Sequence, residues 1–275
     1  MSERITSGSF EFDQNQVVAM REIGQQALGI SEDHFCSGFP DFRGGRIRRL
    51  GHNNARHNYQ VGNHAVLVMA EVGLDSSEQE TGRTTGYTHD LVQLKGRGTD
   101  ERESAEWIEE QIINRGIFPS AVAKLASKAI IGTEPLFDED GPIHGRVIGQ
   151  TAQFLDYDSK REELFVKSVA SADLGELYTP FGPYASHMLY LQRQGRDISD
   201  TPDMGDLINF QGKQTIFLDT YRYPIPEAEG VLATHRRQVQ NYANFVYQQL
   251  REERLESWEQ LIQQDLQFMH NPDAF

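Results

Sequence analysis

Residues 86–108 read GYTHDLVQLKGRGTDERESAEWI, and this stretch decides how the rest of the chain is interpreted. A His-Asp pair, His89-Asp90, stands in a short helical pattern that Lys95-Gly96-Arg97-Gly98 interrupts. Neighbouring residues on a helix point about 100° apart, so these two side chains can share one ion only where the backbone bends. The segment therefore favours a metal site at a helix end, with ordinary polar helix-end residues as the alternative.

Length and composition narrow the class of protein. The chain has 275 residues, a net charge of -15 and a single cysteine. That length can bury a sizeable core, and the acidic balance argues against a general nucleic-acid binder. One cysteine excludes an internal disulfide and Cys-rich zinc sites, so any metal must be held mainly by His and carboxylates. Without an apolar run of about 18 residues or a secretion signal, we expect a soluble cytoplasmic protein with no membrane partner.

The spacing of apolar residues predicts a mainly α-helical fold. The expected helices are 13–28, 57–72, 104–114, 119–131, 147–155, 160–177 and a long C-terminal helix over 226–270. Two polar stretches are expected to be irregular: 75–86 runs through solvent, and 132–146 forms a loop. QTIFLDTYRY, residues 214–223, is the best candidate strand. We expect one domain over 1–275, with the last helix packed across it or against a second copy in a homodimer.

Two further polar residues stand in apolar helical patterns. His64 lies within the helix predicted over 57–72, and Asp173 within the one over 160–177. A buried aspartate is costly unless a cation or a hydrogen bond compensates it. The order His64, His89-Asp90, Asp173 resembles the HD superfamily of metal-dependent phosphohydrolases, in which a His, a His-Asp pair and a distant Asp converge on a metal. The matching contexts are His64-Ala65 with Val68, and Ala172-Asp173-Leu174.

The resemblance covers about residues 51–178 and carries specific implications. It implies an HD-like helical bundle with a core at about 43–180 and a C-terminal helical extension at about 181–275. The implied ligands of a divalent ion (Mn, Fe, Zn, Ni, Co or Mg) are His64, His89, Asp90 and Asp173. His57 competes with His64 for the first ligand position. The implied activity is that of a phosphohydrolase or phosphodiesterase acting on a nucleotide or similar small phosphate ester, with metal-activated water attacking phosphorus.

Basic residues near these positions are candidates for binding the phosphate, because the planar guanidinium suits phosphate oxygens. They are Arg43, Arg46, Arg48 and Arg49 in RGGRIRR, followed by Lys95 and Arg97 after the His-Asp pair, the last two being candidate catalytic residues that would contact the phosphate. A solvated charged loop is the alternative for the arginine-rich segment. His57-Asn58 resembles the His-Asn pair that protonates the leaving oxygen in phosphodiesterases of this superfamily, so His57 is also a candidate general acid.

Departures from the family pattern keep other functions open. Residues 91–94 lack the acidic residue that some members carry one turn after the pair, which favours a non-catalytic nucleotide or metal sensor. Between the pair and Asp173 only His144 is available as an extra ligand, so one metal is favoured over two. A two-metal oxygenase would need more ligands than we find. The acidic segment with Glu134, Asp138 and Asp140 lacks the calcium-loop spacing, and we assign it no ion.

Overall fold

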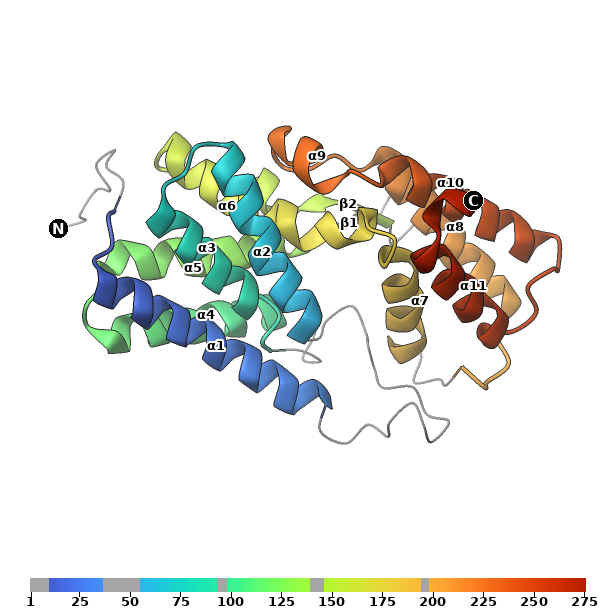
Figure 1. The fold of residues 1–275 in the computed structure, drawn as a ribbon, viewed down its shortest axis with the longest axis horizontal. Helices are drawn as coiled ribbons and strands as arrows, with labels where there is room; N and C mark the ends of the chain where they lie inside the picture. Colours follow the sequence, from blue (N-terminus) through green and yellow to red (C-terminus); the bar gives the residue numbers. More distant parts are fainter. Residues whose placement is uncertain (1–9, 37–54, 93–97, 139–145, 194–197) are drawn as a thin grey trace.

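The computed structural model describes residues 10–36, 55–92, 98–138, 146–193 and 198–275 (Figure 1). The α-helices in this part of the chain are α1 (Gln14–Cys36), α2 (Ala55–Glu71), α3 (Ser76–Thr88), α4 (Thr99–Arg115), α5 (Ser120–Thr133), α6 (Lys160–Gly175), α7 (Gly182–Arg193), α8 (Met204–Thr220), α9 (Glu227–Leu232), α10 (Arg236–Arg251) and α11 (Trp258–His270). Strands β1 (Pro135–Asp138) and β2 (Arg146–Gln150) pair antiparallel, with Pro135 opposite Gln150. Short 3-10 turns are η2 (Thr151–Gln153), η3 (Glu176–Tyr178) and η4 (Pro272–Ala274). A mainly α-helical bundle is confirmed.

Helices α1 to α6 form one side of the molecule and α7, α8, α10 and α11 the other, with the β1–β2 hairpin between them (Figure 1). On the first side, one apolar cluster joins α2, α5 and α6 through residues such as Phe165 and Val166. A second joins α1, α4 and α5 through Met20, Ile108 and Ile130. Burial of these side chains supplies the main stabilisation, at about 1.5–3 kcal/mol each.

The C-terminal helices have their own apolar cluster, which includes Tyr242, Trp258 and Phe268. This cluster also takes in Val68 of α2 and Leu174 of α6, so the C-terminal helices pack directly on two helices of the first group. The expected division near residue 180 remains a prediction.

Helix α3 corrects the prediction that residues 75–86 run through solvent. The Asp75 side chain accepts hydrogen bonds from the backbone amides of Ser77 and Glu78, and Glu78 accepts from the Asp75 amide, which is a capping box. Hydroxyls within the helix donate to carbonyls four residues earlier, at Thr81, Thr85 and Thr88. Because its polar groups are satisfied locally, α3 can be buried although few of its residues are apolar.

Small residues bring α3 and α2 unusually close. A Cβ added at Gly86 would lie 2.6 Å from the Cα atom of Gly62, and one added at Gly62 would lie 2.4 Å from the Tyr87 ring. No side chain fits between backbones at that separation. The two glycines therefore set the distance between α2 and α3, the helices that lead to His57 and His89.

Four other expectations are wrong. Residues 147–155, predicted as helix, form most of β2 and the turn η2, and part of the predicted loop 132–146 forms β1. The candidate strand 214–223 lies largely in α8, whose start is capped by Asp203. The single helix predicted over 226–270 is three helices, since the chain turns between α9 and α10 and again after Glu252, with Glu253 at φ 56°.

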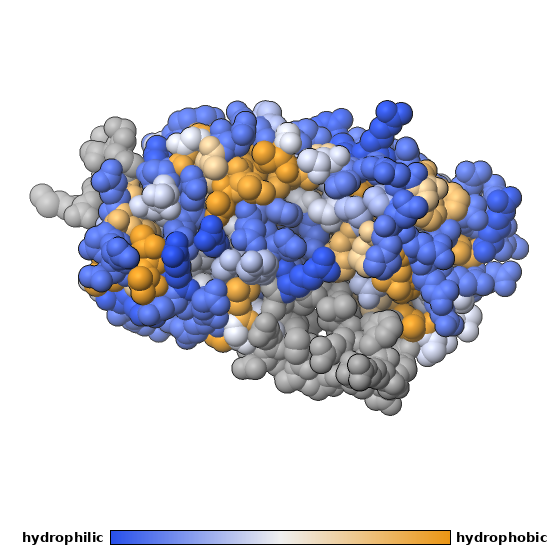
Figure 2. Space-filling model, viewed as in Figure 1, coloured by the Kyte–Doolittle hydropathy of each residue, from blue (hydrophilic) through white to orange (hydrophobic). Residues whose placement is uncertain are grey.

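Charged and polar residues cover most of the face drawn in Figure 2, with an apolar patch around α6 and α9. None of the helices in the described ranges combines the length and apolar character needed to cross a membrane.

Candidate metal centre

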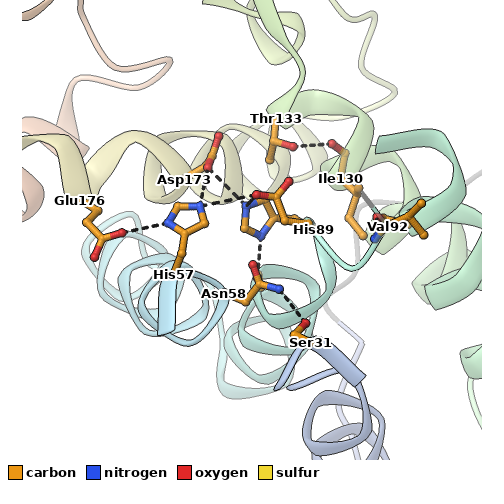
Figure 3. A network of polar contacts seen from close by, with 12 residues as sticks. Ser31, His57, Asn58, His89, Val92, Ile130, Thr133, Asp173 and Glu176 are labelled. Atoms are coloured by element: carbon orange, nitrogen blue, oxygen red, sulfur yellow. Dashed lines mark hydrogen bonds and ion pairs between the residues drawn. The ribbon is translucent and has the colours of Figure 1, made fainter. Parts of the chain in front are cut away.

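Four polar side chains from three helix ends meet at one point, and Figure 3 labels three of them, His57, His89 and Asp173. His57 lies in the first turn of α2, His89 and Asp90 follow the last residue of α3, and Asp173 lies in the last turn of α6. The last turn of the helix tightens at the pair, because the Leu91 amide donates to the Thr88 carbonyl, three residues earlier, at 2.9 Å. His89 Nε2 and Asp90 Oδ2 lie 3.4 Å apart, close enough to share one ion.

The donor atoms are close together. His57 Nε2 lies 3.2 Å from Asp173 Oδ1 and 3.8 Å from Asp90 Oδ2. His89 Nε2 lies 3.3 Å from Asp173 Oδ1 and 3.4 Å from Asp90 Oδ2. Both histidines are 1% exposed, whereas the Asp90 and Asp173 side chains are 18% and 14% exposed. Solvent therefore reaches the cluster on its carboxylate side.

His89 presents an unused nitrogen to this cluster. Its Nδ1 lies 2.8 Å from the Gly86 carbonyl oxygen, which can only accept, so the Nδ1 proton is fixed there. Its Nε2 is buried and has no hydrogen-bond partner. In the neutral ring this nitrogen carries a lone pair, and a metal ion is the partner that such a nitrogen suits.

His57 is held from its other side by a carboxylate. Its Nδ1 lies 3.0 Å from Oε2 of Glu176, a 2% exposed residue at the start of η3. Burial acts to lower the pKa of His57, but hydrogen bonds to Asp173 and Glu176 outweigh it and raise the pKa to about 10. Without a metal, His57 is thus an imidazolium between two carboxylates, and a bound cation would replace its Nε2 proton.

The remaining groups are shifted by the same contacts. Burial acts to lower the pKa of His89, but the charges of Asp90 and Asp173 raise it. Burial acts to raise the pKa of Asp173, but the hydrogen bond with His57 and the positive charges of the two histidines lower it well below its usual range. The pKa of Asp90 is raised by burial despite the attraction of both histidines. In this cluster the positive charge of the histidines stabilises the Asp173 carboxylate.

The donor set fits a divalent metal ion. The ligand atoms of His57, His89 and Asp90 all lie within 4.8 Å of one another. Two ligands about 2.1 Å from one ion, at angles of about 90–110°, are about 3.0–3.4 Å apart, which matches the separations of His89 Nε2 from both carboxylates. His57, His89 and Asp90 can hold a metal ion, and Asp173 contacts both histidines.

The preference for His64 over His57 as the first metal ligand remains a prediction, but among the described residues His57 and not His64 lies in the cluster. The two histidines are seven positions apart on α2, nearly two turns and about 10 Å along the helix, so they share a face but not a site. His64 Nδ1 is buried without a hydrogen-bond partner, and a Cβ added at Gly175 would lie 3.1 Å from it. Burial lowers the pKa of His64.

The general-acid role of His57 remains a prediction; its Nε2 lies in the cluster, 3.2 Å from Asp173 Oδ1. Asn58, its neighbour, turns away and donates to Ser31 Oγ of α1 at 3.1 Å. The predicted phosphate-binding residues lie outside the described residues: Arg43, Arg46, Arg48, Arg49, Lys95 and Arg97. His144, the extra ligand considered for a second metal, also lies outside the described residues.

Two residues around the cluster were missed. Glu176 follows Asp173 by three residues, so a carboxylate at that helical spacing was a readable signal. Gln150, at the end of β2, donates from Nε2 to Asp173 Oδ2 at 3.1 Å. Nothing in the sequence indicated it, because the hairpin that places it was predicted as loop and helix.

Comparison with known proteins places the fold but no family. No protein-family model and no curated protein sequence matches the chain. Among solved structures, that of Bacillus subtilis YpgQ in complex with ADP matches with a TM-score of 0.51 and 14% sequence identity. The match covers 87% of this chain and 97% of YpgQ. The two proteins share a helical fold over nearly their whole length.

Proposed function

We propose that this protein is a metal-dependent phosphohydrolase or phosphodiesterase of the HD type, acting on a nucleotide or a similar small phosphate ester. The observation that carries the proposal is the convergence of His57, His89, Asp90 and Asp173 at three helix ends. The order of these residues in the chain is the HD order, with His57 as its first member. A fold similar to that of a protein solved with ADP supports a nucleotide as the substrate class.

The chain's own residues account for binding and positioning. His57, His89, Asp90 and Asp173 would hold a divalent ion, and Glu176 would orient His57 through its Nδ1. The ion, when bound, would neutralise phosphate charge and lower the pKa of a water. The exposed edges of Asp90 and Asp173 face solvent, so a phosphate would approach from that side.

The test is turnover of a phosphate-ester panel by chelator-stripped protein, with and without Mn²⁺. The panel holds nucleoside mono-, di- and triphosphates, a cyclic nucleotide and a nitrophenyl ester, with phosphate or product release as the readout. His89→Ala is compared with His270→Ala, an exposed histidine on α11 far along the chain. We expect Mn²⁺-dependent release by wild type and by His270→Ala, and none by His89→Ala.

Two results would contradict the proposal. Turnover that survives in His89→Ala would place the chemistry elsewhere. Nucleotide binding with no turnover of any ester would replace the enzyme by a non-catalytic nucleotide or metal sensor. A two-metal oxygenase is not proposed, since one His-carboxylate group in the described residues meets the distance requirement for an ion.

A further inference from the structure

A chain of hydrogen bonds runs from the C-terminal helices to the metal cluster. Tyr221, the residue after α8, donates from its hydroxyl to Gln150 Oε1 at 3.0 Å. Gln150 Nε2 then donates to Asp173 Oδ2 at 3.1 Å and lies 3.4 Å from the Thr133 carbonyl oxygen. The path joins residues that lie 71 and 23 positions apart in the sequence.

The direction of this path is fixed by the chemistry of its ends. The Asp173 carboxylate and the Thr133 carbonyl only accept hydrogen bonds, so the Gln150 amide nitrogen must face them. Its oxygen is left to accept from a donor, and the Tyr221 hydroxyl is that donor. Gln150 is fully buried and Tyr221 is 4% exposed, so breaking either bond would leave a buried polar group unpaired.

The two oxygens of Asp173 have different partners. Oδ1 lies 3.2 Å from His57 Nε2 and 3.3 Å from His89 Nε2, in the cluster. Oδ2 accepts from Gln150. Because one oxygen is held from behind, the carboxylate plane is fixed and Oδ1 is directed at the position an ion would occupy.

Tyr221 is itself held firmly. Its ring stacks on Phe217 with centroids 4.9 Å apart and meets the Tyr223 ring edge-on at 5.7 Å. Its amide donates to the Phe217 carbonyl at 2.8 Å, and Arg236 Nη1 lies 3.4 Å from the Tyr221 carbonyl oxygen. Burial raises the pKa of Tyr221 well above its usual value, so the phenol remains a donor.

We infer that Gln150 and Tyr221 are positioning residues of the metal centre, and that α8 is thereby an integral part of that centre. The inference rests on the proposed metal site and adds to it the means by which Asp173 is aligned. Loss of supporting partners of this kind typically weakens metal binding about 10–100-fold.

The experiment measures Mn²⁺ affinity in chelator-stripped full-length protein, with free Mn²⁺ followed by electron paramagnetic resonance. The variants are Tyr221→Phe, Gln150→Met and the double substitution. The matched control is Tyr223→Phe, which removes a buried hydroxyl that has no hydrogen-bond partner. The ring centroid of Tyr223 lies 5.7 Å from that of Tyr221. The visible absorption spectrum of Co²⁺ added to each variant reports the ligand environment, and melting of the metal-free forms reports folding.

We expect Gln150→Met to bind Mn²⁺ about 10–100-fold more weakly, Tyr221→Phe to weaken binding in the same direction, and both to alter the Co²⁺ spectrum. Tyr223→Phe should match wild type. Since Tyr221 acts through Gln150, adding Tyr221→Phe to Gln150→Met should cause no further loss of affinity.

Wild-type affinity and an unchanged Co²⁺ spectrum in Tyr221→Phe would overturn the inference. Fully additive losses in the double variant would also overturn it, because each residue would then act independently. Failure of wild type itself to bind Mn²⁺ or Co²⁺ would instead refute the proposed metal site. The two failures are therefore distinguishable.

Discussion

The competing histidines on α2 offer a quantitative test of the metal centre. His57 has its Nε2 3.2 Å from Asp173 Oδ1, whereas His64 is packed against Gly175 and is absent from the cluster. Removing a ligand should weaken Mn²⁺ binding by at least about 100-fold, the upper end of what loss of a supporting residue costs. His57→Ala should show this loss and His64→Ala should not.

The expected magnitude follows from linkage between binding and folding. At a Mn²⁺ concentration of about 100 times the wild-type Kd, binding stabilises the native state by about 2.7 kcal/mol. For a chain of this size that raises Tm by about 5–10 °C. In His57→Ala the same concentration is about equal to the Kd, so the gain falls to about 0.4 kcal/mol and the shift to about 1 °C.

The assay is a thermal melt of each chelator-stripped variant with and without Mn²⁺, at one pH. The difference between the two melts is the readout, so any loss of stability from the substitution itself cancels. His64→Ala should keep the full shift even if its metal-free Tm is lower. A full Mn²⁺ shift in His57→Ala together with its loss in His64→Ala would refute the assignment and restore the ligand order first expected from the sequence.

Three further predictions concern the surroundings of the site and the core. Glu176→Gln removes the charge that orients His57, and Mn²⁺ titration should show about 10-fold weaker binding. Asp265→Asn leaves the 2% exposed His187 without the carboxylate 2.7 Å from its Nδ1, and urea unfolding should show a loss of about 3–5 kcal/mol. Gly86→Ala forces apart two helix backbones, and the same measurement should show a loss of about 1–3 kcal/mol.

The predictions for Glu176 and Gly86 can each be contradicted by a specific result. Unchanged Mn²⁺ affinity in Glu176→Gln would show that Glu176 is only a folding residue. Gly29→Ala, on α1 with open space around the added Cβ, should be neutral or slightly stabilising. A loss in Gly29→Ala equal to that in Gly86→Ala would remove close packing as the cause.

The pair of His187 and Asp265 also predicts the direction in which the stability of the protein changes with pH. Burial acts to lower the pKa of His187, but Asp265 and Gln211 raise it above its usual value. A group with a raised folded-state pKa contributes stability that is present below about pH 6.5 and lost as pH rises through the folded-state pKa. Wild type should therefore lose stability as pH rises above about 6.5, by an amount that Asp265→Asn lacks. Equal pH dependence in both proteins would contradict the ion pair.

Amphipathic helices could be predicted from the sequence. Helices α2, α5 and α6 begin and end within a few residues of the expected bounds, and α4 ends where expected but begins five residues earlier. Helix α3 could not be predicted from apolar spacing, because threonines and glycines bury it. Its capping box at Asp75 and Glu78 was a readable signal that apolar periodicity overrode. The breaks after α9 and α10 could not be predicted from breaker residues, since the turn at Glu253 uses a non-glycine residue with positive φ.

The sequence predicted the residue types of the candidate site better than the particular residues. His89, Asp90 and Asp173 lie together as their order suggested. The choice between His57 and His64 depended on which turn of α2 lies beside the cluster, and the spacing of residues in the sequence does not reveal this. Gln150 and Tyr221 come from a hairpin and a helix end that the sequence patterns misplaced, so the hydrogen bonds behind Asp173 had no sequence signal.

The ends of the helices explain why a cation suits this place. His89 and Asp90 follow the C-terminal end of α3, and Asp173 lies in the last turn of α6. Helix C-termini carry partial negative charge, and carboxylates placed there are unfavourable unless positive charge compensates them. The metal-free cluster meets this need with protonated His57. A divalent ion would meet it more fully, and it would also let a chain with a net charge of -15 attract an anionic phosphate to this point.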